Sequence, residues 1–518
     1  MGVEKRRLAI NISAQLLTFV VQFLISFLLT PFIVNRLGID AYGFIGLADN
    51  FVMYAQLLVV ALNSMSLRFV SIAYYRNDIK EANEFASSVL FANLFFAIIV
   101  FFINLFLVLF LDNIIDIPDS LVFDVKLLFF LMFLVFEVSI VFSVYQVSTF
   151  IKNRLELNSI RSIIANLIRT LVLVVAFACF KPYLFYMGIA MLMCTIYIAV
   201  TNYRYTKILT PKIKISYNDF DFSKIKILLS CGLWNTLTKL GNLLGENLDL
   251  LLTNLFISAI AMGNLSLAKK MPVLVLTLFS SICVAFGPLL TKSYALNNRE
   301  EMKKQMFFAI KLISSISIIP LCFLFSISDM FYSLWVPEVD SLNLYFITVI
   351  FSLPLVFALA LEPIQHIIVI TNKVKGYSLA TILFNLLNFI SLLIIVKKAP
   401  SCYMLYYMVG VISFWALWRV GLFLPIYSAN CIKEKKTFFY GSLFRITMAL
   451  LISVSVTLLS KLYFIRDITW SSFTLITLFL VIICFISSWF IILDRESRKR
   501  VLTIVGRRIN TVIGNISS

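Results

Sequence analysis

The amino-acid sequence predicts an all-α membrane protein that crosses the bilayer about fourteen times. Of its 518 residues, 61% are hydrophobic and only 14% are charged, and a soluble fold has too little interior to bury so much apolar surface. Apolar stretches of helix length also recur along the whole chain. In addition, loop and charge positions repeat about 220 residues apart, which predicts two homologous six-helix lobes followed by two further helices.

Each apolar stretch of sufficient length is expected to form one span. The first follows Lys5, Arg6 and Arg7 and continues to about residue 34 without a small-residue cleavage site, so it should remain as a span rather than act as a signal peptide. The expected spans are 8–35, 43–68, 86–111, 123–150, 158–180, 182–202, 226–256, 261–290, 304–328, 342–371, 376–396, 402–428, 438–461 and 470–493.

The charges between the spans predict the orientation of the chain. Lysine and arginine concentrate in the N-terminal segment, in the 203–226 loop and in the tail, whereas the opposite loops carry few of them and contain Asp329, Glu338 and Asp340. Because basic loops stay on the cytoplasmic side, both termini are expected to be cytoplasmic. The same clusters explain the net charge of +18, so we expect no nucleic-acid partner.

The repeat is visible in loops as well as in spans. Segment 37–51 aligns with 257–271, and segment 71–85 aligns with 291–305, both at an offset of 220. Chance similarity between apolar sequences is a poor explanation for loop and charge positions that stay in register over such a distance, so we infer a duplication. Six spans per lobe is an even number, so the two lobes should run in the same direction.

Further along the chain the offset slips by one residue. Gln146 then aligns with Gln365 and Asn153 aligns with Asn372. Spans thirteen and fourteen lie outside the repeat. The expected domains are an N-lobe over 1–215, a C-lobe over 216–430, and the last two spans with the tail over 431–518.

Polar side chains within the spans mark a candidate substrate cavity. In span seven, Asn235, Lys239, Glu246 and Asp249 recur at helical spacing and therefore share one face. Ionisable groups at bilayer depth cost on the order of 3 kcal/mol each, so this face should line a water-filled cavity. Span one carries a matching polar stripe. The expected cavity residues are Lys239, Arg169, Glu246, Asp249, Asn235, Gln15, Gln22, Asp49, Asn63, Lys269 and Asn385.

Several of these residues have a simpler explanation that stays open. Asp49 and Lys269 lie near expected span ends and could be residues that snorkel to the interface. Glu137 lies at a depth similar to that of Arg169, and the two could form a pair that holds spans four and five together.

Ion coupling has its own candidates. Glu362 and His366 lie four residues apart in span ten, so they could exchange protons or form a satisfied buried pair. The candidate ion-coupling residues are Glu362, His366 and Glu137.

No motif for bond-making chemistry is present in the sequence. There is no Walker A loop, no H-E-x-x-H and only one histidine, and the eight cysteines are scattered through or beside apolar stretches. We therefore expect no catalytic residues, no metal and no cofactor. The enzyme alternative, a membrane glycosyltransferase or ligase, typically has a large non-cytoplasmic loop, whereas the longest loop here is basic and is expected in the cytoplasm.

The chain resembles the Wzx-type polysaccharide flippases in three features. These are the loop NRLGIDAYG after span one, the loop RNDIKEANEF after span two, and the arrangement of two six-helix lobes plus two helices. These flippases belong to the multidrug/oligosaccharidyl-lipid/polysaccharide exporter superfamily. The resemblance implies a multi-pass protein of the bacterial inner membrane. It would turn undecaprenyl-diphosphate-linked oligosaccharide repeat units of O-antigen, capsule or exopolysaccharide to the outer leaflet by alternating access.

The resemblance also implies partners and leaves alternatives. The expected partners are the lipid-linked oligosaccharide, membrane lipids, and further a polysaccharide polymerase and a chain-length regulator. A lipid II-type flippase, which also has fourteen spans, stays open as an alternative. A small-molecule antiporter of the same superfamily stays open as well, although it would need twelve spans.

Overall fold

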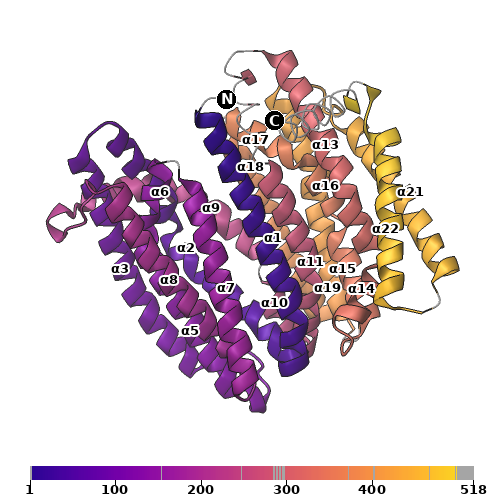
Figure 1. Cartoon of the computed structure of the whole chain (residues 1–518), viewed down its shortest axis with the longest axis horizontal. Helices are drawn as coiled ribbons and strands as arrows, with labels where there is room; N and C mark the ends of the chain where they lie inside the picture. The colour runs from indigo at the N-terminus through magenta and orange to yellow at the C-terminus, as the bar shows by residue number, and fades with distance from the viewer. Residues whose placement is uncertain are drawn as a thin grey trace, which may run out of the picture. The chain divides into compact units, whose positions relative to one another are not determined.

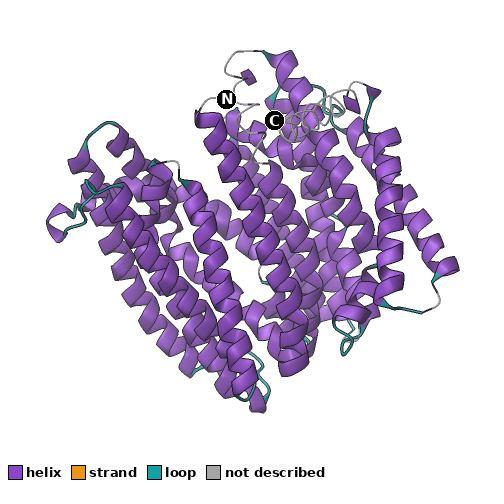
Figure 2. Cartoon of the chain, in the orientation of Figure 1, coloured by secondary structure: helices purple, strands orange, loops and turns teal. Residues whose placement is uncertain are grey.

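The computed structural model of this chain is helical throughout the part that it describes. Figure 2 shows helices joined by loops, and this part of the chain contains no strand. The described residues are 3–152, 154–246, 248–283, 286, 290, 293–294, 298–371, 373–400, 403–465, 467–495 and 497–498. The predicted all-α, multi-pass membrane fold is confirmed.

The number of membrane-crossing helices is close to the prediction. Twelve of the described helices are long and apolar enough to cross a membrane, and one bent pair, Ser341–Ser352 with Leu355–Ile368, raises the number to thirteen. The expected span 226–256 coincides with α9 (Phe222–Glu246) and α10 (Asp249–Phe256). The polar stripe of α9 lowers its mean hydropathy and α10 has only eight residues, so neither helix is apolar and long enough by itself.

Packing divides the chain into two compact units, unit 1 (Met1–Ser266) and unit 2 (Leu267–Ser518). Within unit 1, Figure 1 shows the long helices α3, α5, α8 and α7 packed side by side. The helices that complete unit 1 with α9 and α10 are α1 (Val3–Leu37), α2 (Ile39–Tyr75), α3 (Ile79–Leu109), α4 (Leu111–Ile114), α5 (Val122–Val141), α6 (Val147–Ile151), α7 (Leu155–Cys179), α8 (Tyr186–Leu209) and the start of α11 (Ala259–Cys283).

Helix α9 packs within unit 1 because glycine allows a very close approach to α2. A Cβ added at Gly232 would lie 1.9 Å from the carbonyl oxygen of Ala61. Small residues at a helix crossing bring two backbones together in this way. The packing boundary after Ser266 therefore differs from the lobe boundary at 215/216 that the repeat predicts. The first follows contacts and the second follows sequence duplication, so the lobe boundary stays a prediction.

Two repeat-equivalent residues begin their helices with the same geometry. The Asp78 carboxylate accepts a hydrogen bond from the Glu81 N–H at 2.9 Å and caps α3. Asn298, which lies 220 positions later, accepts one from the Glu301 N–H at 3.0 Å and caps α13 (Arg299–Ser326). A side-chain oxygen at this position satisfies a backbone donor that the helix leaves unpaired. The aligned loops therefore share local structure as well as sequence.

A second repeat-equivalent pair is in direct contact. Gly43 of α2 and Gly263 of α11 lie so close that a Cβ on Gly43 would be 2.9 Å from the Gly263 backbone. A Cβ on Gly263 would in turn be 2.2 Å from the Ile39 carbonyl oxygen. Gly46 faces Ser266, again its repeat equivalent, at 2.7 Å from the serine Oγ. The duplicated positions of α2 and α11 thus touch each other within unit 1.

Unit 2 is built around α13, which packs against α16, α21 and α22. A buried hydrophobic cluster of this unit includes Met306, Ile310, Leu359, Ile446 and Leu480. The remaining helical segments of unit 2 are α14 (Ser328–Trp335), α15 (Ser341–Ser352), α16 (Leu355–Leu361), η5 (Glu362–Ile364), α17 (Gln365–Ile370), α18 (Val374–Lys398), α19 (Met404–Leu417), η6 (Trp418–Phe423), α20 (Leu424–Cys431), α21 (Tyr440–Phe464), α22 (Trp470–Ser487) and η7 (Ser488–Ile492).

The two appended helices are tied to unit 2 by polar contacts. Lys461 of α21 forms an ion pair with Asp329 of α14. The hydroxyls of Ser453 and Ser487 join α21 to α22 at 2.7 Å, and both residues are buried. Such hydrogen bonds help to hold spans together where lipid supplies no hydrophobic force between helices.

Candidate substrate and ion-coupling sites

Arg169 is the deepest of the predicted cations and is only partly satisfied. It lies in the middle of α7, where its Nη1 points to the sulfur of Met191 at 3.8 Å. Its Nε is buried and has no hydrogen-bond partner in the part of the chain that the structure describes. The guanidinium interacts electrostatically with Asp49 of α2. A buried donor without a partner is costly, so this group is prepared to bind an acceptor.

Asp249 forms a second charged position against α2. Only 2% of this residue is exposed, and its carboxylate accepts a hydrogen bond from the Leu250 N–H at 2.8 Å. It interacts electrostatically with Tyr54. Tyr54 lies five residues after Asp49, which is about 7.5 Å along the helix axis. The structure therefore brings Arg169, Asp49 and Asp249 to one stretch of α2.

Lys239 is half-buried in α9. The sequence places it in the second lobe, but the packing of α9 against α2 puts it in unit 1 together with Arg169. The side chains of its predicted stripe partners Asn235 and Glu246 lie outside the described residues, as does that of Gln15. Their joint lining of a cavity stays a prediction.

Asn63 belongs to a satisfied network that joins three spans. Its side-chain amide exchanges two hydrogen bonds with that of Asn93 in α3, at 3.0 and 2.9 Å. The Asn93 amide also donates to the Ile140 carbonyl oxygen at 2.9 Å, and Ser143 donates to Asn63 at 3.1 Å. Every one of these bonds is made within unit 1, so the geometry is that of a structural connection.

The equivalent place in unit 2 carries ionisable groups. Glu362 lies 219 positions after Ser143, and Cys283 lies 220 positions after Asn63. Ser280 of α11 donates to the Glu362 carboxylate at 2.8 Å, and the exposed Gln365 donates to its other oxygen at 2.9 Å. Nε2 of His366 lies 3.0 Å from the Cys283 carbonyl oxygen.

Glu362 and His366 also lie at a break in the helix. Pro363 follows the glutamate, and a 3-10 turn over Glu362–Ile364 separates α16 from α17. The two side chains interact electrostatically but each binds a different group of α11. An interrupted helix with ionisable side chains is typical of sites that bind ions or protons in transporters.

Glu137 does not pair with Arg169. It is 7% exposed, and its Oε1 is buried without a hydrogen-bond partner. The described electrostatic neighbours of Arg169 are Cys194 and Asp49 instead. The predicted bond between spans four and five is therefore not formed by these two residues.

The remaining predicted cavity residues, Lys269, Asn385 and Gln22, each have different surroundings. The Lys269 ammonium lies over the ring of Phe351 at 5.3 Å, a cation–π contact. Asn385 is buried with an Nδ2 that lacks a partner, and Gln22 is exposed on α1.

Comparison with known proteins identifies the family. A family model described as "Polysaccharide biosynthesis protein" matches residues 8–294, which is more than half of the chain. The chain belongs to the polysaccharide biosynthesis protein family. A relative from Bacillus subtilis (strain 168), the uncharacterized membrane protein EpsK, is 28% identical over 437 residues, which cover 84% of this chain and 85% of EpsK.

Solved structures share the fold of this family member. An inward-facing multidrug resistance MATE family transporter of the MOP superfamily matches with a TM-score of 0.61 and 16% identity, over 82% of this chain and 98% of the transporter. The lipid II flippase MurJ in its inward closed conformation matches with a TM-score of 0.60 and 14% identity, over 86% of this chain and 96% of MurJ. This polysaccharide biosynthesis protein therefore has the fold of MOP superfamily transporters.

Sequence reasoning missed two parts of the polar interior of this family member. The contact of Asn93 with Asn63 could have been predicted from the sequence. The two residues each lie 15 positions from the cap Asp78, so they reach the same depth on adjoining spans. Arg161 lies near the start of the expected span 158–180 and is 6% exposed in α7, where Nε and Nη1 have no hydrogen-bond partner among the described residues. No pattern in the sequence distinguishes it from a residue at the cytoplasmic surface.

Proposed function

We propose that this protein is a flippase that moves undecaprenyl-diphosphate-linked oligosaccharide repeat units across the bacterial inner membrane by alternating access. The family match and the MOP-type fold support a flippase-type transporter in polysaccharide biosynthesis. The observation that carries the finer proposal is Arg169, a cation deep in a span with a buried donor that has no partner.

The chemistry of the substrate explains why such a cation is needed. A lipid diphosphate carries about two negative charges, and hydrocarbon removes the water that stabilises them. A guanidinium can bind phosphate oxygens with two parallel hydrogen bonds. Arg169 would receive the diphosphate in competition with Asp49, while Lys239 supplies a second positive charge. Asn385, with its unpaired Nδ2, would donate to sugar hydroxyls.

The experiment compares variants in vesicles that contain a labelled lipid-linked oligosaccharide. Arg169→Ala and Lys239→Ala should each slow translocation on the order of tenfold to a hundredfold, the effect of one lost hydrogen bond to a charged group. Lys239→Arg should retain most activity, because charge is required rather than shape. Lys397→Ala, at the exposed end of α18, is the matched control. Normal rates in both deep alanine variants, at normal protein levels, would disprove the role of the cations.

A lipid II-type flippase is the second candidate, and the likeness to MurJ favours it. The same vesicles distinguish the substrates when lipid II or a cationic dye replaces the oligosaccharide. Faster movement of lipid II would identify a lipid II flippase, and movement of the dye would identify a small-molecule antiporter.

We further infer how the protein works in the cell. It acts as a transporter without a cofactor or covalent chemistry, and both its termini lie in the cytoplasm. Its partners would be a polysaccharide polymerase and a chain-length regulator. The repeat unit that it carries would belong to an O-antigen, a capsule or another exopolysaccharide.

A further inference from the structure

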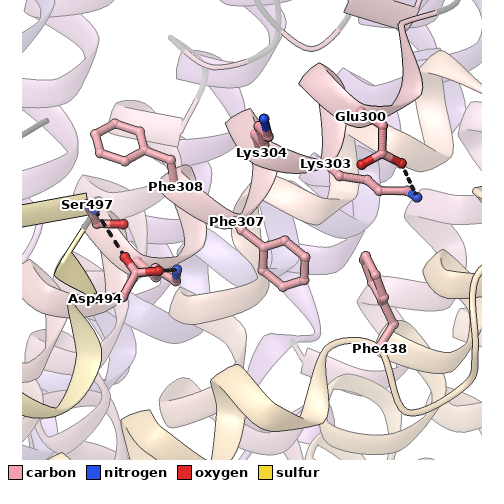
Figure 3. A pocket seen from close by; sticks show the side chains of 9 residues that line it. Glu300, Lys303, Lys304, Phe307, Phe308, Phe438, Asp494 and Ser497 are labelled. Atoms are coloured by element: carbon pink, nitrogen blue, oxygen red, sulfur yellow. Dashed lines mark hydrogen bonds and ion pairs between the residues drawn. The ribbon is translucent and has the colours of Figure 1, made fainter.

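A separate pocket lies in unit 2 at the start of α13. Its volume is about 390 Å³, within the range of roughly 300–1,000 Å³ that is common for small-ligand sites. Figure 3 shows its lining side chains, which come from α13, from the segment before α21 and from the residues after η7. None of them belongs to the sites described above.

Lysines and carboxylates alternate around this pocket. Lys303 pairs with Glu300 at 2.9 Å and with Glu434 at 2.6 Å. Lys311 pairs with Asp494 at 2.7 Å. Lys304 is exposed, and no ion pair within 4 Å is found for it among the described residues. Lys303 and Lys311 are thus each paired with carboxylates, and Lys304 is the lining lysine whose charge no ion pair among the described residues offsets.

We expect the pocket to lie at the boundary between hydrocarbon and water. Helix α13 has 28 residues and is therefore about 42 Å long, whereas the hydrocarbon core is about 30 Å thick. Its first turns carry the charged residues Arg299, Glu300, Glu301, Lys303 and Lys304, which are costly in hydrocarbon, so we assign these turns to the headgroup region. The rings of Phe307 and Phe438 meet there at 4.9 Å, and Figure 3 shows both in the pocket wall. Lys433, Lys435 and Lys436 are exposed on the neighbouring loop.

We propose that this pocket binds the phosphodiester headgroup of an anionic phospholipid from the surrounding bilayer. The single negative charge of the headgroup matches the positive charge of Lys304. A lipid diphosphate, with more charge, would be repelled by Glu300 and Asp494. The phenylalanine rings offer an apolar wall to the glycerol part of the lipid.

The proposal is tested by the binding of phosphatidylglycerol to the purified full chain, measured by native mass spectrometry. Lys304→Ala should weaken binding about fivefold, the usual effect of one lysine near an anionic lipid. Glu300→Gln should strengthen it, because it removes a negative charge from the lining while Lys303 stays paired with Glu434. Lys436→Ala makes the same change in net charge outside the pocket lining and should leave the affinity within about twofold of wild type.

Three comparison ligands distinguish the source of the phosphate. Phosphatidylcholine, inorganic phosphate and undecaprenyl diphosphate are added in place of phosphatidylglycerol, and each should bind at least fivefold more weakly. Equal binding of any of the three would overturn the proposal, as would equal losses in Lys304→Ala and Lys436→Ala. No transport substrate is needed, so the result is independent of the proposed flippase activity.

Discussion

Glu362 is a residue at which the two halves of the duplication differ in chemistry. Its equivalent, Ser143, takes part in a neutral network with Asn63 and Asn93 that satisfies its members. Glu362 receives hydrogen bonds from Ser280 and from Gln365. The same position has thus become ionisable in unit 2 alone, which favours a role beyond holding helices together.

This difference gives a prediction for the pH dependence of transport. Glu362→Gln keeps the size of the side chain and its ability to accept from Ser280, but it cannot release a proton. Transport driven by an imposed pH gradient should fall to the rate without a gradient, while the protein level stays normal. The measurement is translocation in reconstituted vesicles with and without the gradient.

Two outcomes bear on this prediction in opposite directions. The control Ser143→Ala alters the equivalent position of unit 1 and should leave the gradient dependence intact. If Glu362→Gln responds to the gradient as the natural chain does, the glutamate and His366 form a structural pair and coupling lies elsewhere.

At the scale of elements, glycines determine how closely α9 approaches α2. Gly232 faces the Ala61 carbonyl oxygen at a distance that no Cβ can share. Gly410 of α19 is a matched position with no atom within 4 Å of an added Cβ. The two residues therefore differ in surroundings and not in type.

Gly232→Ala should destabilise the protein because α9 must move away from α2. Gly410→Ala should be neutral or slightly stabilising, since alanine favours a helix over glycine by about 1 kcal/mol. Thermal unfolding in detergent, followed by loss of monodisperse protein, measures both. Equal melting temperatures for the two variants would contradict the close packing of α9.

The connection between α13 and the residues after η7 is expected to depend on pH. Burial alone would raise the pKa of Asp494, but hydrogen bonds from Lys311 and Ser497 outweigh it and lower the pKa from 3.8 to about 2. A lowered pKa means that the folded state favours the carboxylate. The stabilisation is therefore present above pH 3.8 and is lost as the pH falls through about 2.

Asp494→Asn tests this connection. The difference in melting temperature between the variant and the natural chain should be greatest above pH 4 and should shrink toward pH 2. A constant difference across this interval would show that Asp494 contributes through packing and not through its charge.

Span ten shows the limit of reading helices from hydropathy. The stretch 342–371 is apolar and of spanning length, so it predicts one helix. The structure has a pair bent by 44° and a 3-10 turn at Glu362. Pro354 and Pro363 are visible in the sequence, but proline inside a span can be accommodated without a break, as in α13 with Pro320. The sequence therefore predicts the ionisable residues of this site but not the break in the helix at which they lie.

At the scale of the whole molecule, composition and periodicity are sufficient for the fold class and for most spans. They are not sufficient to predict contacts between residues that are distant in the sequence. The packing of Gly232 on Ala61 joins α9 to unit 1, whereas the repeat assigns it to the second lobe. Likewise, the stripe in span seven identifies Lys239 and Asp249 as unusual, but only the structure shows Asp249 beside Tyr54.

The orientation of the molecule is testable with two substitutions. Ser341 begins α15 and Ser216 lies in the basic loop between α8 and α9. In a background without the eight natural cysteines, Ser341→Cys should react with an impermeant thiol reagent added to intact cells, and Ser216→Cys should react only after lysis. The reverse pattern would invert the proposed topology.

The contact between Gly43 and Gly263 bears on the ancestry of the chain. In an isologous contact about a two-fold axis, equivalent residues meet each other where the axis passes between them. A single-lobe ancestor would have met a second copy of itself at this glycine, as a homodimer. In that dimer any mutation altered both sides of the contact together. Fusion of the genes would have removed this constraint, and the neighbouring pair is consistent with that freedom, with glycine at position 46 and serine at 266.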